Sequence, residues 1–412
     1  MSVTTNIYKE DVDFVALGRE DSDFGKLLNS SGQLDFSDPK SVQQLTKSLL
    51  KRDFGLKLIL PDDRLCPPVP NRLNYILWLQ DLVDTSSDTY TDSHSLDRQV
   101  HGLDIGTGAS CIYPLLGCTQ HPLWKFTGTG PLIPLDEIGC DSLDFTLCNP
   151  PFYSSAEDLA SSASLKQRPP FTACTGSATE MVCEGGEVSF VSRMIDESLK
   201  LRDRVQWYTS MLGKFSSLSK IIEQLKENKV DNYAVTEFVQ GSRTRRWAVA
   251  WSFGDRRPSM NVSRGCGSLP KSLLPFPAEQ SITILTANKD MVARSLHDTL
   301  SECMTLWTWD SKNFAGVGFC DQAVWSRKSR RGRENARIVS RASGSHVEVE
   351  DQKWPKDMAF GFKISLEELE GDSNGSKVIV RWLQGHNSVL FESFCGMMKR
   401  KLSRLTKALD QD

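Results

Sequence analysis

The 412-residue chain lacks the features of several special classes of protein. No apolar run approaches the roughly 20 residues that a membrane-spanning helix needs, and the amino terminus has no apolar signal core. Eleven cysteines are present, but none forms a CxxC pair or a zinc-ligand spacing. Cysteines in apolar runs, such as Cys111, Cys148 and Cys395, are typical of reduced thiols inside the cell. We therefore expect a protein of the nucleus or cytoplasm, without a membrane or a metal as partner.

The chain also lacks an excess of charge, since its formal net charge is −3. Any nucleic-acid binding must therefore depend on local basic patches. Two candidates are the basic run Arg327–Arg337 and the basic face of the last predicted helix near Lys399. For the run, the alternative is a solvated loop or a nuclear-localisation signal, and the signal is an equal alternative to RNA contact. Hydrophobic residues make up 39% of the chain, which is enough for a sizeable core.

Composition and periodicity divide the chain into four parts. Residues 1–95 are mostly helical, and 96–255 alternate short β-rich runs with helical stretches. Residues 256–279 are rich in Pro, Ser and Gly and read as a linker, and 280–412 suggest a small α+β domain. We predict an α/β fold with a doubly wound, Rossmann-like sheet, a helical amino-terminal part and a small α+β carboxy-terminal domain.

Local signals place some elements of the amino-terminal part. Ser37 or Asp38 caps a predicted helix that has Pro39 in its first turn and Gly55 beyond its end. The run "LKLIL" that follows predicts a strand, and "LNYILWLQDLV" predicts a packed helix. The polar stretch after that helix, "DTSSDTYTDSHSLDR", reads as a flexible connection.

The run "LDIGTGASCIYPLL" carries the first chemical signal. An apolar strand ends at Asp104, and a turn containing Gly106 and Gly108 leads through Ser110 into a helix. Such glycines let the backbone approach a nucleotide-like ligand whose polar groups meet the helix amino terminus. Cys111 stands where the dinucleotide fingerprint has its third glycine, which favours S-adenosylmethionine over NAD. A tight turn without a ligand is the alternative.

The second signal is "NPPF", from Asn149 to Phe152, directly after the strand "LDFTL". Methyl transfer to a planar amino group requires acceptors that hold both amino hydrogens. The side-chain oxygen of Asn149 and the carbonyl of Pro150 are such acceptors, and Pro151 keeps the chain rigid. Phe152 can then stack on a flipped base. A proline turn at a strand end is the structural alternative.

These stretches, with "PNRLNYILWLQDL", "TGSATEMVCEGGEVSFVSRMI" and "TEFVQGSRTRRWAVAWSF", resemble the RNA adenine-N6 methyltransferases. That family includes the eukaryotic methyltransferase-like sixteen proteins, which act on U6 small nuclear RNA, and the bacterial large-subunit rRNA methyltransferase F. The resemblance covers residues from about 14 to 255. It implies S-adenosylmethionine as cofactor and a structured RNA, U6 small nuclear RNA, as partner. It does not indicate an oligomeric state.

The resemblance also implies roles for single residues. Arg72 reaches the carboxylate of the methyl donor, while Asp104, Gly106, Gly108 and Ser110 line the donor pocket. Asn149, which also touches the donor, holds the adenine together with the catalytic residues Pro150, Pro151 and Phe152. Contacts to RNA phosphates are expected from Arg243, Arg245 and Arg246, for which a solvated basic hairpin is an equal alternative.

One departure from the family pattern concerns the donor site. Family members continue after the glycine turn through a second strand ending in an acid that binds the donor's ribose, then a helix and a third strand. Here only 45 positions separate Asp104 from Asn149, and one βαβ unit alone needs roughly 30 residues. The chain therefore lacks a helix, two strands and the ribose-binding acid. "FTGT" at Phe126 resembles the start of the second strand, and neither Asp136 nor Glu137 is a good substitute for the acid.

Two explanations of the departure remain open. The sequence is either an incomplete version of a competent enzyme, or a truly shortened, catalytically impaired RNA-binding relative. Loss of a central strand would expose apolar edges on both sides of the gap, which disfavours the second explanation. In both cases we expect weak binding of the methyl donor.

Overall fold

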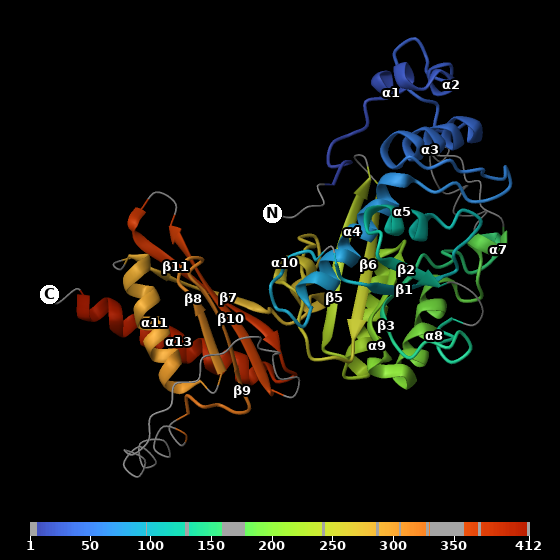
Figure 1. Cartoon of the computed structure of the whole chain (residues 1–412). Helices are drawn as coiled ribbons and strands as arrows, with labels where there is room; N and C mark the ends of the chain where they lie inside the picture. Colours follow the sequence, from blue (N-terminus) through green and yellow to red (C-terminus); the bar gives the residue numbers. More distant parts are fainter. Residues whose placement is uncertain are drawn as a thin grey trace. The chain divides into compact units, whose positions relative to one another are not determined.

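A computed structural model describes residues 6–95, 97–127, 132–158, 178–240, 244–285, 288–304, 306–326, 329, 358–369 and 372–409 (Figure 1). The chain forms two compact units. The first contains residues 1–84, 93–254 and 262–275, and the second contains residues 85–92, 255–261 and 276–412. The chain therefore passes from one unit to the other five times.

A six-stranded sheet forms the centre of the first unit, with the strand order β2-β1-β3-β4-β6-β5. Its strands are β1 (Val100–Ile105), β2 (Trp124–Thr127), β3 (Leu143–Cys148), β4 (Val205–Leu212), β5 (Asn232–Gln240) and β6 (Thr244–Ser252). The first four run parallel, whereas β6 is antiparallel to both β4 and β5.

Helices cover both faces of this sheet, so the predicted doubly wound α/β fold is confirmed. One apolar core joins the sheet to α3 (Pro39–Phe54), α4 (Val69–Thr85) and α5 (Ile112–Gln120). A second core joins the other face to α8 (Gly186–Leu201) and α9 (Phe215–Glu227). The remaining short helices of this part of the chain are α1 (Phe14–Glu20), α2 (Ser22–Gly25), α7 (Ala178–Met181), η1 (Arg202–Arg204), α10 (Met260–Ser263) and η2 (Lys271–Leu273).

The predicted caps of α3 are confirmed. The Asp38 carboxylate accepts hydrogen bonds from the first turn, and Gly55 ends the helix in the left-handed conformation with φ 66°. The strand predicted for "LKLIL" is wrong, because no described strand pairs with it. Instead Leu60 packs on α3 through Val42, while Ile59 is 90% exposed.

The shortening of the chain lies at the edge of the sheet and not at its centre. Strand β1 pairs directly with β2 on one side and with β3 on the other. The four-residue β2 contains the run that resembles the start of the second family strand, so the expected loss of two strands is wrong for that strand. No described strand pairs with its outer side. The expectation of apolar edges on both sides of a central gap was therefore wrong. A continuous sheet remains. The cost of exposed strand edges is therefore no argument against a truly shortened protein.

The second unit is a five-stranded antiparallel sheet with the order β7-β11-β10-β9-β8. Its elements are β7 (Glu279–Ile284), α11 (Lys289–Cys303), β8 (Leu306–Asp310), β9 (Ala315–Cys320), β10 (Phe360–Leu369), β11 (Asp372–Gln384) and α13 (Ser388–Leu409). The two helices pack on one face around Phe362, Trp382 and Phe394. The last helix predicted near Lys399 is α13.

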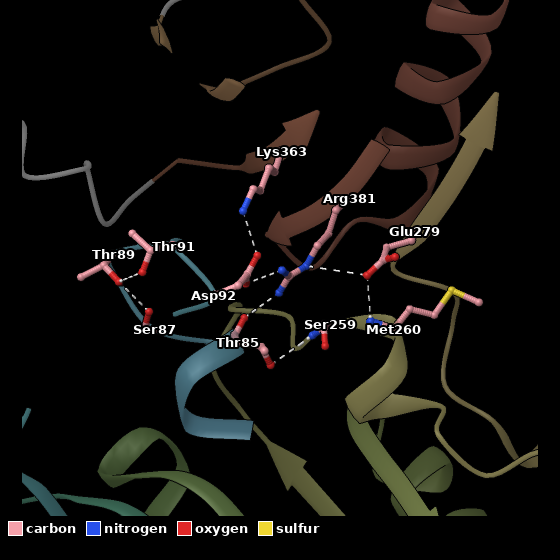
Figure 2. A network of polar contacts seen from close by, with 10 residues as sticks. All are labelled: Thr85, Ser87, Thr89, Thr91, Asp92, Ser259, Met260, Glu279, Lys363 and Arg381. Atoms are coloured by element: carbon pink, nitrogen blue, oxygen red, sulfur yellow. Dashed lines mark hydrogen bonds and ion pairs between the residues drawn. The ribbon is translucent and has the colours of Figure 1, made fainter. Parts of the chain in front are cut away.

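The polar stretch Thr85–Asp92 is a packed part of the second unit and not a bare connection (Figure 2). The Asp92 carboxylate forms ion pairs with Arg381 and, at 2.9 Å, with Lys363. Arg381 also donates a 2.7 Å hydrogen bond to the carbonyl of Thr85, the last residue of α4. Since Arg381 is only 6% exposed, its charge depends on these partners.

A second group of contacts holds the same stretch. Tyr90 is 8% exposed and packs against Phe319 and Leu383. Its hydroxyl donates a 2.5 Å hydrogen bond to Oε1 of Gln384, whose amide nitrogen donates to Asp255 at 2.9 Å. Residues 85–92 and 255–261 are therefore needed to complete the carboxy-terminal unit.

We predict that Arg381→Ala destabilises the second unit by roughly 1–3 kcal/mol, because Asp92 and the Thr85 carbonyl lose a charged donor. Hydrogen exchange should rise in residues 85–92 and in β11. Lys377→Ala is the matched control, because Lys377 lies on the same strand in an exposed pair with Glu367. Equal exchange in the two variants would contradict the prediction.

Candidate functional site

A pocket of about 330 Å³ lies where the carboxyl ends of β1 and β3 meet. The register places Ile105 beside Cys148, so the glycine turn and the NPPF segment leave neighbouring strands at the same edge. The pocket brings together most of the predicted donor-binding and catalytic residues: Arg72, Gly106, Gly108, Ser110, Asn149, Pro150 and Pro151. Ligands of open α/β sheets bind at this edge.

The glycine turn has the backbone conformation that its sequence predicts. Gly106 and Gly108 have φ values of 75° and 62°, which side chains other than that of glycine rarely adopt. Cys111 also has a positive φ, 45°, where the chain enters α5. The turn therefore presents bare backbone to the pocket.

Arg72 reaches the pocket from α4 and is held by a residue that sequence reasoning missed. Its guanidinium donates a 2.5 Å hydrogen bond to the hydroxyl of Tyr113 and lies 5.3 Å from the centre of that ring. Its Nε has no hydrogen-bond partner among the described residues. A buried guanidinium with a spare donor suits a carboxylate ligand. An aromatic residue at the start of the helix that follows the glycine turn was the sequence signal that could have identified Tyr113.

Asp104, the last polar residue of β1, is 2% exposed. Neither of its carboxylate oxygens has a hydrogen-bond partner within the described part of the chain. Burial raises the pKa of Asp104 to about 7, and the nearby charge of Arg72 opposes that rise. Asp104 is not among the residues that line the pocket, unlike its neighbours Ile105 and Gly106. A cationic group that reached its carboxylate would favour the ionised form.

Asn149 directly follows β3, and its Oδ1 is buried without a described hydrogen-bond partner. Pro150 and Pro151 continue the pocket wall. Phe152 lies one step further on, outside the pocket lining. Its backbone neighbour Tyr153 exchanges hydrogen bonds of 3.1 and 3.0 Å with the segment Met181–Cys183.

The predicted RNA-contacting arginines differ in their surroundings. Arg243 lies outside the described residues. Arg245 is exposed and forms an ion pair with Glu237. Arg246 is half-buried and its guanidinium lies over the Phe152 ring, 5.4 Å from its centre. Burial lowers the pKa of Arg246, with a smaller contribution from the charge of Arg72. Their RNA contacts stay a prediction.

No acid follows β2 closely along the sequence. Residues 128–131, which follow β2, are Gly, Thr, Gly and Pro, so the next acids along the chain are Asp136 and Glu137. Asp136 forms an ion pair with Arg204, which directly precedes β4. It therefore lies near the amino ends of the parallel strands, at the edge opposite the pocket. Glu180, a pocket residue that sequence reasoning missed, accepts a hydrogen bond from the Leu65 backbone.

No group of three metal-ligating side chains is close enough to hold a metal ion in the described ranges. Among the same residues, no helix is both long and apolar enough to cross a membrane.

The doubly wound sheet, the glycine turn and the NPPF segment together define an S-adenosylmethionine-dependent methyltransferase. A family described as "RNA methyltransferase" matches residues 3–133 and 131–255. The chain belongs to this family of RNA methyltransferases, as the sequence resemblance predicted.

Several relatives support this assignment. The chain is 32% identical to the U6 small nuclear RNA (adenine-(43)-N(6))-methyltransferase of Schizosaccharomyces pombe, over 90% of this chain and 96% of that protein. It is 36% identical to the human RNA N(6)-adenosine-methyltransferase METTL16, over 74% of this chain and 60% of that protein. The crystal structure of the human METTL16 catalytic domain with a MAT2A hairpin RNA is 37% identical. It matches with a TM-score of 0.52, over 61% of this chain and 95% of that chain.

The comparisons also locate the shortening. The two matched segments meet at residues 131–133, beside the end of β2. The match to the zebrafish relative, 31% identical over 97% of both proteins, extends over 471 positions. That is 59 more than the 412 residues of this chain, so at least 59 positions of the relative have no counterpart here.

We predict that Asp104→Asn stabilises the ligand-free protein at pH 8 but not at pH 4. The folded-state pKa of Asp104, about 7, exceeds its ordinary value of 3.8. Its contribution to stability is therefore complete below pH 4 and is lost as the pH rises to 7. The three-unit difference corresponds to roughly 4 kcal/mol at most.

Urea unfolding at both pH values measures this effect. The control is Asp136→Asn, whose carboxyl is exposed. An equal gain from Asp104→Asn at both pH values would contradict the prediction.

Proposed function

We propose that this chain acts on a structured RNA, and that U6 small nuclear RNA is its substrate, in the nucleus. Relatives from Schizosaccharomyces pombe and Dictyostelium discoideum are named for that RNA, at 32% identity each. The human catalytic domain with a TM-score of 0.52 was solved with hairpin RNA. Transfer of a methyl group to the N6 of adenine is the reaction of these relatives.

The observation that carries the proposal is the unpartnered Oδ1 of Asn149 at the pocket. This oxygen and the Pro150 carbonyl hold the two hydrogens of the adenine amino group. Held in this way, the nitrogen lone pair turns toward the methyl group and away from the ring. Positioning is the main source of acceleration, because S-adenosylmethionine supplies a methyl group that is already activated.

The amino-acid end of the donor fits the residues that are present. Arg72, steadied by Tyr113, receives its carboxylate through the free Nε. The unpartnered carboxylate of Asp104 receives its ammonium group. Both charges are buried, so each interaction is stronger than it would be in water.

The ribose end of the donor fits poorly. Family members use an acid after the second strand, and here none follows β2 before Asp136. We infer that this chain binds the donor weakly and that its methylation activity is low. An RNA-binding relative without catalysis is the second candidate. It is favoured by the exposed basic face of α13, which carries Lys399, Arg400, Lys401 and Arg404.

We predict that Asn149→Ala abolishes the low methylation of U6 small nuclear RNA expected at high donor concentration but leaves RNA affinity unchanged. Transfer is measured with labelled donor, and affinity by fluorescence anisotropy. The reason is that Asn149 acts on the flipped base, whereas phosphate contacts supply most of the affinity. Absence of methylation by the unmodified chain at every donor concentration would instead support the RNA-binding candidate.

We predict no measurable binding of S-adenosylmethionine by calorimetry, and a gain of binding in Thr127→Glu. Thr127 is the exposed last residue of β2, beside Leu103 in register, so a carboxylate there approaches the donor-ribose side. Thr127→Gln is the matched control without charge. Micromolar affinity of the unmodified chain would refute the inferred deficit. Equal donor affinities of Thr127→Glu and Thr127→Gln would show that the missing carboxylate does not cause the weak binding.

A further inference from the structure

Two segments that lie far from Phe152 in the sequence contact its ring: the turn at Gly213 and Arg246 on β6. The turn after β4 passes so close that a Cβ added at Gly213 would lie 2.8 Å from Cδ1 and 3.1 Å from Cε1 of the ring. The guanidinium of Arg246 covers one ring face. The position of the ring therefore depends on how the Gly213 turn is held.

A buried carboxylate holds that turn. Glu187 lies in the first turn of α8 and is 2% exposed. Its Oε2 accepts a 2.6 Å hydrogen bond from the Gly213 amide, and its Oε1 accepts a 3.0 Å bond from the Lys214 amide. Lys214 is the cap of α9 and makes no side-chain capping bond, so the Glu187 carboxylate binds the backbone that leads directly into this helix.

The same carboxylate is connected to the NPPF segment through its own helix start. Gly186, the residue before Glu187, lies against the backbone of Phe152 and Ser154, since a Cβ added there would be 3.5 Å from each. The Glu187 charge also raises the pKa of Arg246 against the lowering by burial. The Glu187 carboxylate thus bonds to the Gly213 turn, and its charge acts on Arg246. The residue before it, Gly186, contacts the segment that carries Phe152.

We propose that Glu187 is a positioning residue that sets the stacking surface of Phe152 for the flipped base. This inference rests on the proposed function, in which Phe152 stacks on adenine. Replacement by glutamine keeps the shape but places an amide donor opposite one of two backbone donors. That amide hydrogen bond is lost, the turn moves away from the ring, and Phe152 is no longer held at the stacking position.

Gly213→Ala acts on the same ring from the turn itself. The added methyl group would lie 2.8 Å from Cδ1 of Phe152 and 3.2 Å from Oε2 of Glu187, so it crowds the ring while the Glu187 charge remains. Glu184→Gln is the matched control, because Glu184 is an exposed carboxylate three residues before Glu187. If positioning of the ring is what matters, the first two variants behave alike and the control behaves as the unmodified chain.

The first readout needs no RNA. With 4-fluorophenylalanine at position 152, the fluorine NMR signal reports the surroundings of the ring. Glu187→Gln and Gly213→Ala should shift or broaden this signal, whereas Glu184→Gln should not. An unchanged signal in Glu187→Gln overturns the inference, whatever the protein does with RNA.

The second readout uses U6 small nuclear RNA with 2-aminopurine at adenine 43, the position named for the yeast relative. Stacking on Phe152 quenches the fluorescence of this base. Glu187→Gln and Gly213→Ala should lower the stacked population by about tenfold, with RNA affinity by anisotropy unchanged. Parallel loss of affinity and thermal stability would show a merely structural role and overturn the inference. If the unmodified chain binds this RNA without quenching, the proposed function fails, and the fluorine signal still decides the role of Glu187.

Discussion

The parallel pairing of β1 with β3 is the constraint on which the rest of the structure depends. It places Ile105 beside Cys148, so that two chain segments separated by more than forty residues leave the sheet side by side. One carries backbone for a donor and the other carries acceptors for an amino group. The pairing is present although the chain is shortened, because the join between the two family-matched segments follows β2, on the other side of β1 from β3. A strand lost from between β1 and β3 would have removed the site altogether.

The site therefore consists of one part that fits its ligand and one that does not. Among the described residues, three groups are buried without a hydrogen-bond partner: Nε of Arg72, the carboxylate of Asp104 and Oδ1 of Asn149. Such groups cost stability in the empty protein, and a suitable ligand removes that cost. On the outer side, β2 ends in a run without a carboxylate. In the proposed function, recognition of the amino-acid end of the donor is thus separated from recognition of its ribose.

Much of this was predictable from the sequence because the signals were local. Glycines at 106 and 108, the cap at Asp38 and the segment from Asn149 to Phe152 each specify their own backbone. Contacts between distant residues were not predictable in this way. Nothing in the sequence near Glu187 indicates that its carboxylate receives the amides of Gly213 and Lys214, and the strand predicted for "LKLIL" failed because no partner strand exists among the described elements. Likewise the polar stretch after α4 looked like a connection, because its partners on β10 and β11 are nearly three hundred residues away.

That stretch has a consequence for how the protein is made. Tyr90 is synthesised 294 residues before Gln384, the partner of its hydroxyl. Residues 85–92 therefore leave the ribosome long before β11 exists. Until β11 is made, Tyr90 lacks the contacts that bury its side chain. Contacts of such long range form slowly and leave apolar surface open to other chains in the meantime. Strands β10 and β11 therefore complete a unit whose first segment, residues 85–92, was synthesised much earlier.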